Sequence, residues 1–179
     1  MSSMNSSQRP PRSTLTPRTA TKTTAPASPQ EASKPNPQAA EQNRNVKPRP
    51  PEEGAIIDYG YLWKREEAGG QDNAVKARPC YIYGVKKIEE LYLVCVMPIS
   101  SSSTGARVPI HPRERASLGL PDDCDVVIEE MNAFLWAGPD IIPQPDRSLM
   151  RHNPASKKLT SAINQAMAGR TPAVVYRSP

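Results

Sequence analysis

The stretch that decides the fold reads CYIYGV at residues 80–85 and LYLVCVM at residues 91–97. Both runs combine β-branched, aromatic and other apolar residues over the length of a strand, and the charged residues 86–90 separate them. Pro79 favours extended backbone at Arg78, just before the first run. We therefore predict an antiparallel hairpin that turns within residues 86–90 and whose second strand ends at Pro98.

Further short apolar runs flank this hairpin. Residues 55–63 read AIIDYGYLW and predict a first strand, whereas the polar residues 64–76 contain Gly-Gly and Asp-Asn turn formers and predict a long loop. On the other side, the serine-rich residues 100–105 predict a second loop, and residues 107–110 predict a short strand.

Between residues 112 and 136 the pattern alternates between helix and strand signals. Pro112 suits a first helical position and Gly119 suits a helix stop, which predicts one or two helical turns. Residues 126–128 and 134–136 predict a strand pair or one bulged strand. Short strands joined by loops, with one small helix among them, favour a compact antiparallel barrel over an α/β sheet.

A basic amphipathic helix is predicted near the C-terminus. It should begin after a cap at Asn153-Pro154 and stop at Gly169. Its apolar residues recur at helical spacing and share one face: Leu159, Ile163 and Met167. This face favours a helix packed on the barrel.

Composition divides the chain into three parts. Residues 1–53 are rich in Pro, Ser and Thr and have no aromatic residue, so they cannot offset the cost of ordering, and we predict a disordered arm. Residues 54–150 form the predicted barrel domain, and residues 151–179 form the basic helix and tail. Residues 1–53 carry 8 basic and 4 acidic side chains, residues 54–150 carry 10 basic and 14 acidic ones, and residues 151–179 carry 5 basic and no acidic ones. The net positive charge therefore lies outside the predicted barrel.

The three cysteines, Cys80, Cys95 and Cys124, include no CxxC pair, and the chain has only 2 histidines to join them. We therefore expect neither a metal site nor a cofactor. Cysteines within apolar runs indicate a reducing compartment, which predicts a cytoplasmic protein. No apolar run reaches the roughly 18 residues of a membrane span, so we expect no membrane partner.

Several separated motifs, in this order and spacing, together resemble the PemK/MazF superfamily of plasmid-maintenance and chromosomal toxins. They are YGYLW at residues 59–63, KARPC at 76–80, MPIS at 97–100, LGL at 118–120 and NAFLWAGPD at 132–140. The resemblance covers residues 54–145. It implies an SH3-like barrel that cuts single-stranded RNA as a homodimer, inhibits growth and is silenced by an acidic antitoxin protein.

The resemblance also implies site residues. Arg78 stands where the family has a catalytic arginine before proline, and Ser100 stands where it has a threonine after Pro-x. Glu130, or Glu129 if the register slips, matches an acidic residue on a later strand. The motif departs from the family at residue 101, where related toxins with the aromatic start often have histidine and this chain has Ser101.

Metal-independent RNA cleavage gives these residues defined roles. The guanidinium of Arg78 would stabilise the phosphorane formed when the 2′-hydroxyl attacks phosphorus. Glu130 would be the general base, and Ser100 would orient a phosphate. Trp63, Lys64 and Lys76 would bind the substrate, with the loop at residues 69–76 as a lid.

Each role has a structural alternative. Arg78 would instead pair with Glu66 or Glu67 across the loop, Glu130 would be solvated on a strand edge, and Ser100 would belong to a flexible loop. The aromatic residues could stack on bases, but packing is the favoured interpretation for all of them except Trp63: Tyr59, Phe134 and Trp136.

These patterns lead to two functional hypotheses and a weaker third. The first is a toxin-like, metal-independent endoribonuclease that inhibits growth. The second is a degenerate SH3-like barrel that binds protein or nucleic acid without catalysis, because fold does not dictate function. The third is an adaptor whose basic arms do all the binding.

Overall fold

The computed structural model describes residues 49–177, so the predicted N-terminal arm lies almost entirely outside the described residues. The described chain is mainly β, with one sheet and three short helices. The strands are β1 (Ile56–Gly60), β2 (Ala77–Ile88), β3 (Leu91–Ser100), β4 (Arg107–Pro109), β5 (Asp125–Val127), β6 (Glu130–Leu135), β7 (Ile141–Ile142) and β8 (Ala173–Tyr176). The helices are α2 (Lys64–Ala68), α3 (Pro112–Ser117) and α4 (Lys157–Met167).

The predicted hairpin is confirmed as β2 and β3, which pair in antiparallel register from Ile88↔Leu91 to Cys80↔Pro98. The turn is tighter than expected because Glu89 adopts a positive φ of 54°. The prediction that Pro98 ends the second strand is wrong. Although Pro98 has no N–H donor, the strand continues past it, because the next two residues, Ile99 and Ser100, pair with β5.

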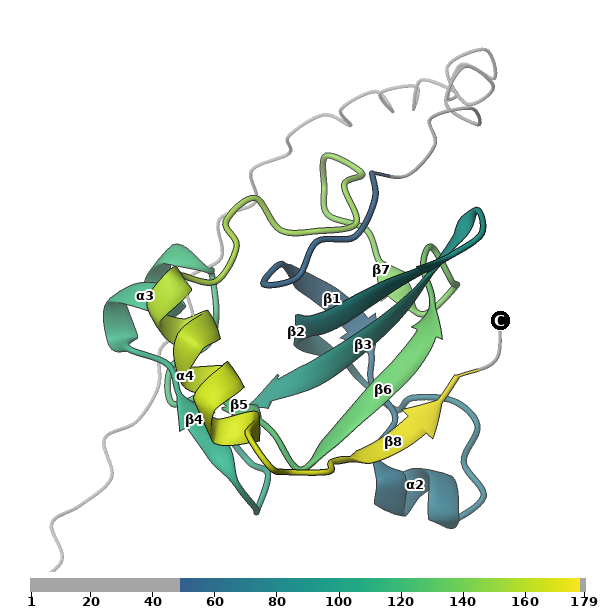
Figure 1. The fold of residues 1–179 in the computed structure, drawn as a ribbon, viewed down its shortest axis with the longest axis horizontal. Helices are drawn as coiled ribbons and strands as arrows, with labels where there is room; N and C mark the ends of the chain where they lie inside the picture. The colour runs from purple at the N-terminus through teal and green to yellow at the C-terminus, as the bar shows by residue number, and fades with distance from the viewer. Residues whose placement is uncertain (1–48, 178–179) are drawn as a thin grey trace, which may run out of the picture. The chain divides into compact units, whose positions relative to one another are not determined.

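β3 organises the sheet. β5 and β6 both pair with it on the side opposite β2, and they do not pair with each other. Of the two predicted alternatives, the strand pair is wrong, and the two segments instead follow one another along β3, as in the alternative of one irregular strand. The strand path runs β4-β5-β3-β2-β1-β7, with β6 and β8 beside it, and within residues 49–177 no pairing joins β4 to β7. The sheet is strongly curved but open (Figure 1).

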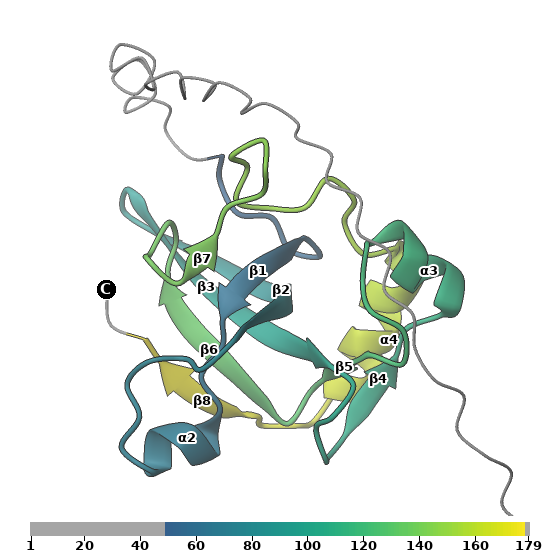
Figure 2. The same cartoon turned by 180° about the vertical axis from the view of Figure 1, so that it is seen from behind.

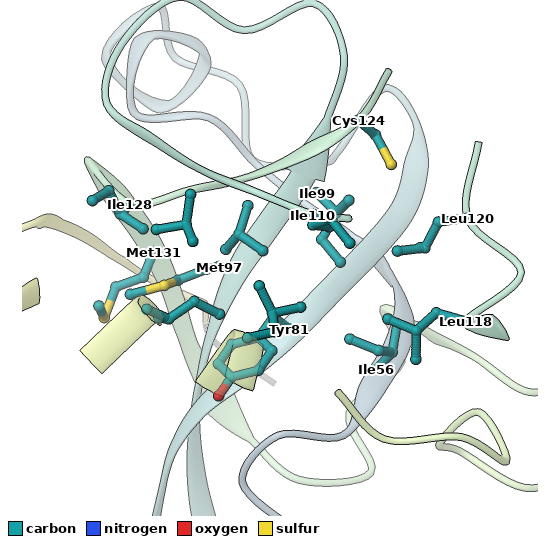
Figure 3. Close-up of a cluster of buried hydrophobic side chains, with 14 of the residues drawn as sticks. Ile56, Tyr81, Met97, Ile99, Ile110, Leu118, Leu120, Cys124, Ile128 and Met131 are labelled. Carbon is teal, nitrogen blue, oxygen red and sulfur yellow. The ribbon is translucent and has the colours of Figure 1, made fainter. Parts of the chain in front are cut away.

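One face of the sheet packs under α4. The predicted apolar stripe is confirmed, because Leu159, Ile163 and Met167 are all buried. The start of the helix differs from the prediction: Ser156 is the N-cap, and its Oγ accepts a hydrogen bond of 3.1 Å from Leu159 N. Figure 3 shows the apolar side chains that converge beneath this helix from the strands and from the segments around α3.

The opposite face carries a second apolar cluster that includes Tyr59, Tyr61, Trp63, Ile82 and Phe134. The rings of Tyr59 and Phe134 stack with centroids 4.3 Å apart, which confirms the packing interpretation for these two aromatics. In β1, Ile56 belongs to the first cluster and Ile57 and Tyr59 belong to the second, as the period of two in a strand leads one to expect.

Two elements correct the sequence analysis. The predicted loop at residues 64–76 begins as α2, because the Glu66 side chain reaches back to accept a hydrogen bond of 3.1 Å from Trp63 N and caps the first turn. The basic tail contains β8, which pairs in parallel with β6. Three helices are therefore present where one or two were expected.

Arg151 connects the C-terminal part of the chain to β1. Its guanidinium donates to both carboxylate oxygens of Asp58, at 3.2 and 2.6 Å, and to the carbonyls of Leu118 and Gly119, at 2.8 and 3.0 Å. One arginine thus joins β1, the end of α3 and the segment that leads to α4.

Different helices lie at the two ends of the sheet. α3 and α4 lie together beside β4 and β5, whereas α2 lies at the opposite end beside β8 (Figure 1, Figure 2). No helix among residues 49–177 is long and apolar enough to cross a membrane.

Candidate active site

The candidate site begins where β1 ends. Residues 61–63 follow β1 outside regular secondary structure, with Trp63 in extended conformation, and the buried Asn132 side chain of β6 holds Leu62. Leu62 N donates to Asn132 Oδ1 at 2.9 Å, and Asn132 Nδ2 donates to the Leu62 carbonyl at 2.8 Å. A side-chain amide therefore replaces a strand partner and fixes Trp63 at the start of α2.

Trp63 is the centre of a group of aromatic and cationic side chains. The residue is 7% exposed, and the edge-to-face contact of its ring with Tyr61 has a centroid distance of 5.1 Å. Arg78 Cζ lies 4.8 Å and Arg65 Cζ lies 5.5 Å from the centroid of the Trp63 ring. Both distances are within the range of cation–π attraction.

Arg78 has no acidic partner among residues 49–177, which contradicts the structural alternative of an ion pair with Glu66 or Glu67. Glu66 caps Trp63 N, and Glu67 pairs with Lys64. Arg78 Nε is buried and has no hydrogen-bond partner. The side chain as a whole is half-buried.

Glu130 begins β6 and reaches the same region. Its Oε2 accepts a hydrogen bond of 3.3 Å from Lys64 N, while its Oε1 is buried without a partner. Burial raises the pKa of the Glu130 carboxyl above its ordinary value, although Lys64 N and Arg65 oppose the shift. The alternative of a simply solvated carboxylate does not describe this side chain.

The Tyr61 hydroxyl links Glu130 to Arg78. It is buried and lies close enough to the Glu130 carboxyl to lower the pKa of that group as a hydrogen-bond donor, although no bond of standard geometry joins Tyr61 Oη to Glu130 Oε1. Burial raises the pKa of Tyr61 far above its ordinary value, the Glu130 charge adds to that shift, and Arg78 opposes it. The charges of Glu130 and Arg78, 52 positions apart in sequence, thus both act on the Tyr61 hydroxyl.

A pocket of about 160 Å³ opens beside Trp63. Its walls come from α2, the β3–β4 loop, the end of β5 and the start of β6: Trp63, Arg65, Ser103, Thr104, Val127, Glu129 and Glu130. Ser103 is 8% exposed, and its Oγ is buried without a partner.

The β3–β4 loop is held against the pocket by Glu129. Ala106 N donates to Glu129 Oε1 at 2.9 Å. Gly105 has a φ of 120°, and a Cβ at this position would collide with the Glu129 carboxylate, so glycine is required there.

The structure brings together some predicted site residues and separates others. Trp63 and Glu130 line the pocket, and Arg78 adjoins it through the Trp63 ring. Ser100, at the end of β3, does not line it, and its Oγ accepts a hydrogen bond of 3.3 Å from Ser102 N. Lys64 and Lys76 are exposed and also lie outside its walls.

The predicted lid, residues 69–76, does not line the pocket. Arg177, which directly follows β8, donates to the Asp72 carbonyl of this loop and to Asp140 Oδ2 at 2.9 Å. The C-terminal strand therefore anchors the loop.

No family model matches this chain, and neither a curated protein nor a solved structure gives a significant match. The resemblance to the PemK/MazF superfamily therefore stays a prediction. In the described part of the chain, no group of three or more His, Cys, Asp or Glu side chains could hold a metal ion.

Sequence reasoning missed four residues that shape the site: Arg65, Ser103, Thr104 and Asn132. The serine run offered no signal for which hydroxyl would face a pocket. Asn132 did offer one, because an amide between Met131 and Ala133 in an apolar strand needs hydrogen-bond partners.

Proposed function

We propose that this chain is a metal-independent endoribonuclease that cleaves single-stranded RNA, built on an SH3-like barrel of the PemK/MazF type. One observation carries the proposal: Arg78, which has no acidic partner among residues 49–177, lies over the Trp63 ring, and Trp63 lines the same pocket as Glu130, a half-buried carboxylate with a raised pKa. Groups with shifted pKa values beside a pocket are characteristic of catalytic sites.

The proposed reaction uses the two groups in turn. The Glu130 carboxylate removes the proton of the 2′-hydroxyl, the resulting oxygen attacks the adjacent phosphorus, and the 5′-oxygen leaves and is protonated by water. The fork of Arg78 donates to the phosphorane oxygens, where preorganised donors contribute about 3 to 4 kcal/mol each. Trp63 supports this role because its ring holds the guanidinium in place.

The proposal includes a homodimer, an acidic antitoxin as partner and a cytoplasmic location. Exposed apolar side chains support a protein interface: Val75, Ile88, Leu91, Ile142 and Tyr176. The basic tail supports an acidic partner less than its composition suggests, because Arg151 and Arg177 are paired with Asp58 and Asp140 within the chain.

A second function, binding without cleavage, is favoured by the charge of the pocket walls. Glu129 and Glu130 both line the pocket, and two carboxylates repel a phosphate that approaches them.

One experiment separates these functions. Purified full-length protein is incubated with a long single-stranded RNA in the presence of EDTA, beside Arg78→Lys and the control Arg113→Lys, an exposed arginine on α3. We expect cleavage by the wild type and the control, and a loss of about 10²-fold or more in Arg78→Lys. If the wild type leaves the RNA intact but retards it in a gel, the protein binds RNA without cleaving it, and the second function is favoured.

A further inference from the structure

One face of the sheet extends beyond the helix that covers it. Met97 of β3 and Met131 of β6 belong to the apolar cluster under α4. Because side chains alternate between the two faces of a strand, every second residue from these methionines projects on the same side. Leu93, Leu91 and Leu135 therefore follow on this face, toward the β2–β3 turn and away from the two methionines.

The neighbouring strands widen this surface. Residues that lie opposite each other in paired strands share a face, and Ile88 lies opposite Leu91 while Lys86 lies opposite Leu93. On the other side, Tyr176 of β8 lies opposite Ala133 of β6. We call six of these residues the open face: Tyr176, Leu135, Leu93, Leu91, Ile88 and Lys86.

The open face is apolar and uncovered. Ile88 is 44%, Leu91 is 54% and Tyr176 is 74% exposed. In Figure 1, α4 lies across the far end of β3, and none of the three helices among residues 49–177 lies over the hairpin end of this face. The spacing of strands and residues gives the open face an area of roughly 300 Å², the size of apolar patches that mark protein contacts.

The N-terminal part of the chain has the wrong composition to cover the open face. Residues 1–48 contain no aromatic residue, and their few large apolar side chains are spread along the sequence: Met1, Met4, Leu15 and Val46. A segment of this kind buries too little apolar surface to offset the cost of ordering it. A second folded chain is the better cover.

The charges beside the open face favour a partner that carries the same surface. Lys86 and Lys87 precede the β2–β3 turn and Glu89 and Glu90 form it; all four are exposed, and none forms a salt bridge among residues 49–177. Glu53, at the edge of β2, accepts a hydrogen bond of 3.3 Å from a backbone N–H of that strand. When two such hairpins pack antiparallel about a two-fold axis, the lysines of each face the glutamates of the other.

We propose that the open face is the contact between two copies of this chain, packed face to face about a two-fold axis. The inference rests on the proposed function, which includes a homodimer, and it assigns the surface through which the copies meet. Trp63 belongs to the cluster on the opposite face, and Glu130 alternates with Met131 along β6. Each candidate site is therefore complete within one chain and remains accessible in the dimer.

The test measures the oligomeric state of the full-length protein by analytical ultracentrifugation at micromolar concentration. We expect a dimer for the wild type. Leu91→Glu places a carboxylate from each chain in the contact and should raise the dissociation constant at least about thirtyfold. The matched control is Val75→Glu, at an exposed apolar residue outside the open face, and it should remain dimeric. A monomeric wild type, or a dimer that survives Leu91→Glu, overturns the inference.

Charge reversal tests the two-fold packing and does not depend on whether Leu91→Glu folds. Lys86→Glu/Lys87→Glu and Glu89→Lys/Glu90→Lys should each dimerise about tenfold more weakly than the wild type, because like charges then face each other. An equimolar mixture of the two variants should recover the wild-type affinity, because each hairpin then faces its opposite. A mixture that associates no better than the separate variants overturns the face-to-face arrangement.

Cleavage separates the failure of this inference from failure of the function. Leu91→Glu should cut RNA at the wild-type rate per folded chain, and a monomeric variant that no longer cuts would overturn the claim that each site is complete. If the wild type cuts RNA as a monomer, the contact is wrong and the nuclease stands. If it dimerises through the open face but leaves RNA intact, the nuclease is wrong and the contact stands.

Discussion

Arg151 and Arg78 are two arginines beside β1 with opposite surroundings. Arg151 directs its donors to Asp58 and to two backbone carbonyls, and its side chain is 18% exposed. Arg78 lies over the Trp63 ring, and its Nε has no partner. Arg151 is thus engaged within the fold, whereas Arg78 has no ion-pair partner among residues 49–177, as the proposed catalytic role requires.

The same contrast applies to the two ends of the sheet. Among residues 49–177, seven buried side-chain polar atoms lack a partner, and four of them belong to Tyr61, Arg78, Ser103 and Glu130. Native proteins satisfy most buried polar groups, so a cluster of exceptions needs an explanation. At the other end, Arg115 Nε on α3 also lacks a partner, but the sheet face under α4 is filled by apolar side chains. We therefore expect substitutions at the two ends to affect different properties.

The largest effect is expected at Glu130. Glu130→Gln should reduce RNA cleavage by about 10²- to 10⁴-fold, because it removes the general base. The wild-type rate should increase with pH until the carboxyl is ionised, at a pH above its ordinary pKa of 4.5, because burial raises that pKa. The rate of Glu130→Gln should not follow this profile.

Stability provides the control for this variant. Because the pKa of Glu130 is raised in the folded state, ionisation of the carboxyl destabilises the fold as pH rises through that value. Glu130→Gln should thus be at least as stable as the wild type at pH 7 in urea unfolding. A less stable glutamine variant would make Glu130 a structural residue.

The next effect concerns Arg151, whose donors have partners within the chain. Arg151→Met leaves the Asp58 carboxylate half-buried without its cation, and we expect the free energy of unfolding to fall by about 3 kcal/mol in urea denaturation. The exposed control Arg113→Met should change it by less than about 0.5 kcal/mol. Cleavage per folded molecule should be unchanged, and a specific loss of activity would break the contrast between the two arginines.

Acid titration sharpens this prediction. Although burial raises the pKa of Asp58, hydrogen bonds from Arg151 and Gln144 outweigh it and hold the pKa below the ordinary 3.8. The stabilisation is therefore complete above the ordinary pKa and is lost as pH falls through and below it. Asp58→Asn should lose this part of the acid dependence.

A smaller effect is expected at Asn132, whose side chain both satisfies buried backbone groups and positions Trp63. Asn132→Leu leaves Leu62 N–H and C=O without partners, and we expect a loss of about 2 kcal/mol in thermal or urea unfolding. Cleavage should also fall, because Trp63 loses its anchor. Asn164→Leu, at an exposed position on α4, is the matched control, and equal losses in both variants would contradict this role.

Local patterns predicted the elements whose cause is local. The β2–β3 hairpin and the buried stripe of α4 follow from periodicity, because a continuous run of apolar residues defines each. β8 was missed because four residues in a basic tail have no signal of their own and depend on parallel pairing with β6. α2 was missed because its stop, Gly69, and its polar sequence resemble a loop.

The site was predictable only in part, because some of its residues are placed by contacts that are distant in sequence. Arg78 and Glu130 were identified through a resemblance and Trp63 through its capacity to stack on bases. In the structure Trp63 and Glu130 line one pocket, and Arg78 lies over the Trp63 ring. Ser100 was chosen from a run of four serines, but the direction of each hydroxyl depends on how the β3–β4 loop folds over Glu129. Three positions later, Ser103 is the serine that lines the pocket.

The most direct measurement compares RNA cleavage in EDTA and urea unfolding for four variants: Arg78→Lys, Arg78→Ala, Arg151→Lys and Arg151→Ala. Both Arg78 variants should lose about 10²-fold or more in cleavage, because neither reproduces the guanidinium fork, while the free energy of unfolding changes by about 1 kcal/mol or less. Both Arg151 variants should unfold more easily and keep cleaving. Retained cleavage in Arg78→Ala, or a loss of stability in Arg78→Ala as large as in Arg151→Ala, would contradict the assignment of Arg78 as the catalytic cation.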